Sequence, residues 1–196
     1  MSGSQGSGSL RMEVSPRRGF ADGRALRLLP ALSREHPAVH AIRIVDVYIV
    51  ENAPSLRLED VRDVISDTVA QEVRQAGPAG ETPQSDLPGW DLIIEITTKP
   101  GVTDPVAATA LQALHAFLPG VVPAQARVQT ATQYQVSVRQ SVSSPDAAQL
   151  ASSFHNPLIQ SAFVMTRAQW EAGTRPPCSY PRVADAEPPQ VRTVDL

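Results

Sequence analysis

The chain has 196 residues, of which 42% are hydrophobic and only 5% aromatic, and its formal net charge is −3. This length holds one large domain or two small ones around a mainly aliphatic core. The absence of a dense Lys/Arg run argues against a nucleic-acid partner, and no run approaches the ~20 apolar residues of a membrane span. Cys178 is the only cysteine, so no internal disulfide can form, and we expect a cytoplasmic protein.

The first predicted folding unit covers residues 11–75. The Ser/Gly-rich residues 1–10 before it are interpreted as a disordered tail or an expression remnant. Asp22 is a candidate cap for the first helix, which Pro30 should disrupt near its end. The hydrophobic periodicity predicts strands at 12–15, 42–50 and 69–74 and helices at 23–29 and 57–68.

Residues 76–89 are rich in Gly and Pro, which break both helix and strand, and they are predicted to be a linker. A second folding unit then covers residues 90–170, and the Pro-rich residues 171–196 are expected to form an extended tether to a following domain. Strands are predicted at 92–97, 126–139 and 159–165, and helices from Asp104 to Pro119 and at 146–153. The predicted buried stripe of the longer helix is Val106, Ala110, Leu111, Leu114 and Phe117.

The second unit repeats the first. The segment that begins Glu13-Val-Ser-Pro-Arg-Arg-Gly is echoed by Glu95-Ile-Thr-Thr-Lys-Pro-Gly, 82 residues further on (from 13 to 95), and an Asp follows at the same spacing in both. A repeat of this length indicates two copies of one folding unit. Each copy has the order β-α-β-α-β, so we predict an α+β fold in which the two copies pack about a pseudo-twofold axis.

The sharpest local motif is Lys99-Pro-Gly-Val-Thr-Asp-Pro105. One interpretation is an anion-binding loop, with Lys99 and a helix N-terminus facing a phosphate. The favoured interpretation is structural: Gly101 makes the strand-to-helix turn, Asp104 caps the helix, and Pro105 occupies its first position, where an N–H is not needed. Asp104 would also place a negative charge where a phosphate needs to bind.

Residues suited to catalysis are present but not in a catalytic pattern. His36 and His40 are four apart, yet Pro37 between them disfavours a helical metal site, and neither phosphate-binding glycine motif occurs. Glu13 and Glu95 match across the repeat; they can meet at a pseudo-twofold axis, but solvated strand positions are the favoured interpretation. The residue pattern therefore predicts no catalytic, cofactor-binding or metal-binding residue in this chain.

The second unit resembles the small PurS subunit of phosphoribosylformylglycinamidine synthase and its counterpart at the start of the long single-chain enzyme. The resemblance is carried by Thr98 to Pro105, by Ala126-Arg-Val128 and Tyr134, and by Phe154-His-Asn-Pro-Leu-Ile159, which contains the motif residues Asn156 and Pro157. The first unit is similar but diverged, with Asp67-Thr-Val-Ala70 where the second has Asn156-Pro-Leu-Ile159.

The resemblance implies a function without chemistry of its own. PurS-like subunits form a dimer that joins the ATP-dependent synthetase to the glutaminase and supports the passage of ammonia in purine biosynthesis, and tandem copies imitate this dimer. The synthetase core and the glutaminase are then the expected partners, and ATP and magnesium are expected only in the synthetase portion. The alternative is a regulatory module that binds a small molecule between the two α+β units, which requires a polar cavity there.

Overall fold

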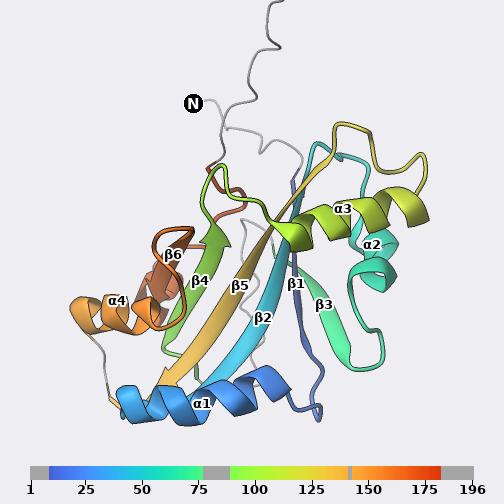
Figure 1. Ribbon diagram of the computed structural model, residues 1–196. Coiled ribbons are helices and arrows are strands. Elements are labelled where there is room, and N and C mark those ends of the chain that lie inside the picture. The colour runs from blue at the N-terminus through green and yellow to red at the C-terminus, as the bar shows by residue number, and fades with distance from the viewer. Residues whose placement is uncertain (1–8, 77–88, 141–142, 182–196) are drawn as a thin grey trace, which may run out of the picture.

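The computed structural model describes residues 9–76, 89–140 and 143–181, so most of the predicted tail and linker and the end of the predicted tether lie outside the described residues. The predicted α+β class is confirmed: these residues form one six-stranded antiparallel sheet and five helices (Figure 1). The strands are β1 (Leu10–Pro16), β2 (Val39–Glu51), β3 (Gln71–Ala76), β4 (Leu92–Thr98), β5 (Arg127–Val138) and β6 (Gln160–Thr166), and the helices are α1 (Gly23–Glu35), α2 (Leu58–Ile65), α3 (Pro105–Phe117), α4 (Ser144–Ser152) and α5 (Arg167–Glu171).

The strand order in the sheet is β3-β1-β2-β5-β4-β6. The first three strands of the chain and the last three therefore adopt the same order within their own half, and the two long strands β2 and β5 pair at the centre. That pairing runs from Val39↔Val138 to Glu51↔Arg127, with a register shift near Ala41. It joins the two halves into one continuous sheet.

Two apolar clusters lie between the sheet and helices α1 to α4. In the first, Leu32 of α1 and Leu150 of α4 pack with Leu92, Ile94 and Val136 of the sheet. In the second, helices α2 and α3 pack with strand residues of β1 and β2. Helix α1 therefore contributes to the core beside β4 and β5, and α3 to the core beside β1 and β2, as Figure 1 shows for their positions across the sheet. Among the described residues, no helix is both long and apolar enough to cross a bilayer.

Residues 167–181 contribute to a third layer on the opposite side of the sheet. Trp170 of α5 packs edge-on against Trp90, with ring centroids 5.9 Å apart, and Tyr180 is buried against Val47 and Ile49. Residues 171–181 fall in the predicted tether, yet the structure packs them against the sheet. The sequence of this segment, rich in Pro, gives no periodic signal for such packing.

Three predicted helix features are wrong in detail. Helix α1 continues through Pro30 to Glu35. Pro30 and Leu26, whose carbonyl the proline leaves unpaired, are both exposed, so water can satisfy that carbonyl. Helix α2 ends at Ile65 rather than at 68. In α3, Val106 and Phe117 are 52% and 73% exposed, and the buried residues are Ala107 and Leu114, so the buried stripe is turned toward Ala107.

Candidate functional site

The loop between β4 and α3 holds three of the six motif residues, and a fourth, Pro105, begins α3. Gly101 has φ +85°, the left-handed region that glycine adopts at little cost. The Asp104 carboxylate accepts a hydrogen bond from the Ala107 N–H at 3.0 Å and another from the Thr130 hydroxyl at 2.7 Å. Pro105 begins the helix. With both oxygens of Asp104 engaged, the loop has the geometry of a capped turn.

The other two motif residues lie against this loop. The Lys99 N–H donates to the Ile159 carbonyl at 2.9 Å, and the Lys99 ammonium donates to the Pro157 carbonyl. Asn156 accepts the Leu158 N–H on its side-chain oxygen at 3.0 Å. Two segments that are separate in the sequence, 99–105 and 156–159, therefore form one structural unit at the end of β4 and the start of β6.

The first half makes the same contacts with different residues. The Arg17 N–H donates to the Ala70 carbonyl at 2.9 Å. Asp67 accepts the Val69 N–H at 2.9 Å, and its own N–H donates to the Gln71 side chain at 2.9 Å. In the second half the Asn156 N–H donates to the Gln160 side chain at 2.8 Å. Asp67 thus performs the turn function of Asn156, although the first half lacks the Asn-Pro pair.

A buried polar cluster lies on the face of the sheet that Tyr180 covers. Arg11 donates to both oxygens of Glu95, at 2.9 and 2.7 Å, and to Glu13 at 3.0 Å. Glu95 also accepts from the Gln133 amide at 2.8 Å and from the Tyr180 hydroxyl. The expectation that Glu95 is solvated is wrong: the residue is fully buried. Its carboxylate is stable there because four donor groups on three side chains surround it.

The charges in this cluster shift the pKa of two of its members. Burial alone lowers the pKa of Arg11, but the charge of Glu95 and its hydrogen bonds outweigh this and raise the pKa above its ordinary value. Burial raises the pKa of the Tyr180 phenol, and the nearby Glu95 carboxylate raises it further. Arg11 therefore stays charged and Tyr180 stays neutral at ordinary pH, which suits a fixed structural network.

Sequence reasoning missed three members of this cluster. Arg11, Gln133 and Tyr180 come from β1, β5 and the segment after α5, and nothing in their local sequence links them to Glu95. The strict match of Glu13 with Glu95 across the repeat was the one available signal, because both carboxylates lie next to Arg11.

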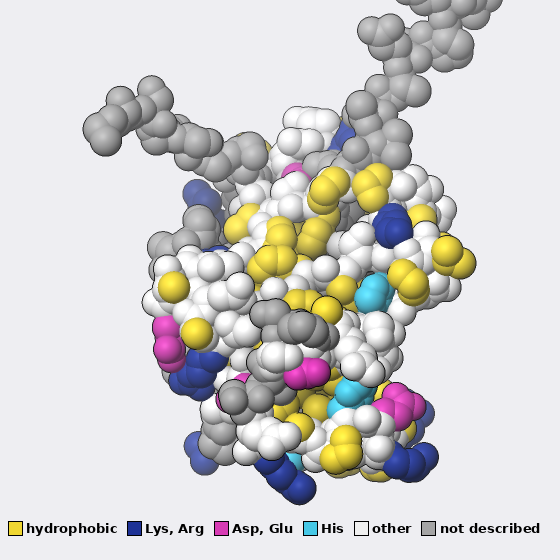
Figure 2. All heavy atoms as spheres, turned by 90° about the vertical axis from the view of Figure 1, so that its left-hand side faces the viewer, with side chains coloured by type: hydrophobic (Ala, Val, Ile, Leu, Met, Phe, Trp, Pro, Cys, Tyr) yellow, Lys and Arg dark blue, Asp and Glu magenta, His cyan; other side chains and the backbone are white. Residues whose placement is uncertain are grey.

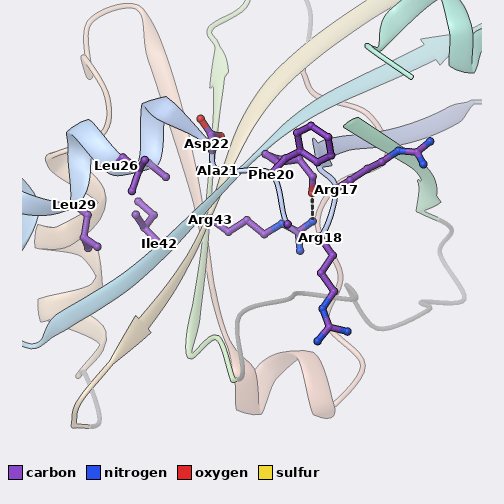
Figure 3. A pocket seen from close by; sticks show the side chains of 12 residues that line it. Arg17, Arg18, Phe20, Ala21, Asp22, Leu26, Leu29, Ile42 and Arg43 are labelled. Atoms are coloured by element: carbon purple, nitrogen blue, oxygen red, sulfur yellow. Dashed lines mark hydrogen bonds between the residues drawn. The ribbon is translucent and has the colours of Figure 1, made fainter. Parts of the chain in front are cut away.

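A hollow of about 280 Å³ lies at the loop between β1 and α1 (Figure 3). Its apolar lining includes Phe20, Leu26, Leu29 and Ile42, and its polar lining includes three arginines, Arg17, Arg18 and Arg43, together with Asp22. In Figure 3, Leu26 and Leu29 of α1 lie on one side of the hollow and the guanidinium groups of Arg17 and Arg18 on the other. Phe20 and the end of the Arg43 side chain lie between them. Phe20 and Leu26 are 50% and 64% exposed, so part of this lining faces solvent.

Three of the four histidines, His36, His115 and His155, take part in structural hydrogen bonds. The His36 ring lies 3.0 Å from the Ser153 hydroxyl, His115 lies 3.2 Å from the Pro123 carbonyl, and His155 lies 2.8 Å from the Ala151 carbonyl. Within the residues that the structure describes, no group of three or more His, Cys, Asp or Glu residues is arranged to hold a metal ion.

No protein-family model and no curated protein matches this chain. Its function is therefore inferred from its residues and their geometry.

Proposed function

We propose that this chain is a non-catalytic, PurS-like assembly domain of phosphoribosylformylglycinamidine synthase, which supports the passage of ammonia from glutaminase to synthetase. The observation that carries the proposal is the equal strand order in the two halves of the sheet, β3-β1-β2 and β6-β4-β5. The matching contacts around Asp67 and Asn156 support it at the level of individual hydrogen bonds.

We further propose that the two halves are tandem copies related by a pseudo-twofold axis. Glu13 pairs with Val47 across β1 and β2, and Glu95 pairs with Gln133 across β4 and β5. If Glu13 and Glu95 correspond, then Val47 corresponds to Gln133, which is 86 residues further on (from 47 to 133). The same offset relates Asp46 to Thr132, and these two residues pair with each other between β2 and β5. An axis through that pair would exchange the two strands.

This arrangement is what a fused dimer needs. A twofold axis makes the same surface meet itself, and two copies of one strand meet along such an axis in antiparallel orientation, as β2 and β5 do. Fusion in one chain fixes the pairing at any protein concentration. The fused pair would then offer a permanent surface to the synthetase core and the glutaminase, with ATP and magnesium bound in the synthetase.

The sensing alternative depends on a polar cavity between the halves. A hollow lined by Glu35 and His36 of the first half and by Asp146 and Gln149 of the second fits that description. Glu35→Gln and Asp146→Asn would distinguish the two functions, because they should alter a metabolite-dependent rise in melting temperature and leave assembly with the synthetase unchanged.

The proposed function is tested by removing residues 1–196 from the complete enzyme and supplying the chain in trans. Added chain should raise the glutamine-dependent amidation rate of the truncated synthetase more than the ammonia-dependent rate, since an assembly domain organises the path between two active sites. The truncated synthetase must first be shown to fold. Unchanged rates with both nitrogen sources, despite measurable binding of the chain, would exclude the proposed function, as would ATP hydrolysis by the purified chain alone.

A further inference from the structure

The hollow at the β1–α1 loop has a counterpart in the second half. That second hollow, at the β4–α3 loop, is lined by Thr98 to Val102, Asp104, Val128 and Gln129. At offsets of 82 residues for the loop and 86 for the strand, these positions correspond to Pro16 to Phe20, Asp22, Ile42 and Arg43, all of which line the first hollow. The same part of the fold therefore forms a hollow twice.

The chain itself enters the second hollow. Pro181 forms part of its lining, and the preceding residue is held by Gln129. The Gln129 amide donates to the Tyr180 carbonyl at 3.1 Å, and its oxygen accepts the Tyr180 N–H at 3.0 Å. The Gln129 side chain thus holds the main chain at Tyr180 from both sides, and the second hollow is where this segment of the chain lies against the sheet.

The first hollow differs in charge. Its lining comes from β1, α1, the loop between them and β2, and none of the described residues from the end of the chain lines it as Pro181 lines the other. Arg43 stands where the second half has Gln129, and Arg18 stands where it has Pro100. Arg43 already donates to Ser15, to the Pro16 carbonyl and to Glu72.

Arg17 and Arg18 make the rim of the first hollow basic in a chain whose net charge is −3. Both residues are exposed. Arg17 donates its Nε–H to the Gln71 carbonyl, and the outer nitrogens of its guanidinium donate to none of the described residues. The carboxylate in the lining, Asp22, is already paired with Arg24. A ligand that suits this surface has negative charge beside an apolar group, because the floor contains Phe20, Leu26, Leu29 and Ile42.

We propose that the first hollow binds an extended acidic segment of a partner protein. An apolar side chain of the segment, Pro or an aromatic or aliphatic residue, lies on the floor between Phe20 and Leu26, and flanking carboxylates pair with Arg17 and Arg18. The proposal stands whether or not the partner is a synthetase, because it depends on the local match between the two hollows and on charge.

The test is fluorescence anisotropy with the full chain and a fluorescein-labelled probe peptide, Asp-Glu-Tyr-Pro-Leu-Asp-Glu. We expect saturable binding that weakens as NaCl is raised from about 0.05 to 0.5 M, since exposed charge pairs are screened by salt. The double variant Arg17→Gln/Arg18→Gln should bind about 5- to 10-fold more weakly at low salt. Leu26→Ser should also weaken binding. Arg62→Gln, which changes an exposed arginine on α2 away from the hollow, is the control and should bind as the unmodified chain does.

Amide chemical-shift changes on adding the probe should fall on residues 16–26. Equal binding by the double variant and by Arg62→Gln would overturn the proposal. Equal affinity for a peptide with Lys in place of each acidic residue would also overturn it. Complete displacement of the probe by inorganic phosphate, at the same concentration of negative charge, would indicate a simple anion site and would overturn it too. Binding seen only after removal of residues 182–196 would assign the hollow to the chain's own end and would likewise overturn it.

Discussion

The buried pair of Arg11 and Glu95 offers the sharpest test of how the two halves are held together. We predict that Glu95→Gln lowers the free energy of unfolding by about 3 kcal/mol, near the lower end of the cost of removing one partner from a buried ion pair. The amide keeps the size of the carboxylate and can still accept from Tyr180, but its NH₂ group would face the Arg11 donors. The Arg11 cation stays partly compensated in this variant, because Glu13 lies 3.0 Å from it and the Pro177 carbonyl accepts from it at 2.8 Å. For this reason we do not expect a cost at the upper end of the range for breaking a buried ion pair.

The assay is equilibrium urea unfolding followed by far-UV circular dichroism. With a slope of about 2 kcal/mol/M, a loss of about 3 kcal/mol moves the midpoint down by about 1.5 M. Glu171→Gln is the control, because this side chain is 65% exposed and, among the described residues, pairs with Arg167 one helical turn away. Its cost should stay below about 0.5 kcal/mol.

A double-mutant cycle separates the pair from its surroundings. Arg11→Met alone should also destabilise the chain, because it leaves Glu95 buried with fewer donors. The double variant Arg11→Met/Glu95→Gln should lose less than the sum of the two single losses, since neither remaining group carries an unpaired charge. A cost below about 1 kcal/mol for Glu95→Gln, or single losses that add without coupling, would refute the reasoning.

Two further predictions concern Tyr180 and Asp104. Burial and the Glu95 carboxylate raise the pKa of Tyr180, so the phenol stabilises the folded chain below its unfolded pKa of about 10, and this stabilisation is lost as the pH rises above that value. The difference in unfolding free energy between the chain and Tyr180→Phe should therefore shrink between about pH 9 and 11.5, measured by urea unfolding at each pH. A difference that stays constant with pH would contradict this. Asp104→Ala should cost about 0.5–2 kcal/mol in thermal unfolding and Asp104→Asn much less, because Asn caps about as well; an equally large loss with Asn would show that the charge itself is needed.

Much of the fold was predictable because it depends on local chemistry. Alternating apolar residues place the six strands to within a few residues, and Asp104 followed by Pro105 predicts the start of α3 correctly. Helix ends were less predictable. The end of α2 is set by Asp67, whose carboxylate accepts the Val69 and Ala70 N–H groups, and this competition with the helix is not visible in hydrophobic periodicity.

The buried cluster was not predictable for a different reason. A glutamate on a strand is expected on a solvated face, whereas Glu95 is buried and accepts a hydrogen bond from Tyr180, 85 residues away. Arg11, 84 residues away in the other direction, supplies the compensating charge. A hydrophobic pattern over ten residues contains no information about burial by residues that are distant in the sequence. The hollow at the β1–α1 loop was also only partly predictable. Its basic rim is evident in the sequence, but its apolar floor forms only when α1 and β2 are placed beside the loop.

The two matched turns allow the proposal of tandem copies to be tested by substitution. Thr68 occupies the position of Pro157, directly after the capping residue, and its N–H donates to no described residue, whereas the N–H groups of Val69 and Ala70 are used by Asp67. If the first turn has the backbone of the second, Thr68→Pro loses no hydrogen bond and restricts the unfolded chain. It should stabilise the protein by about 0.4–1 kcal/mol. The measurement is urea unfolding beside Pro157→Thr, which should lose a similar amount. A loss of more than about 1 kcal/mol with Thr68→Pro would show that the backbones differ, and would remove the turn as support for two copies of one unit.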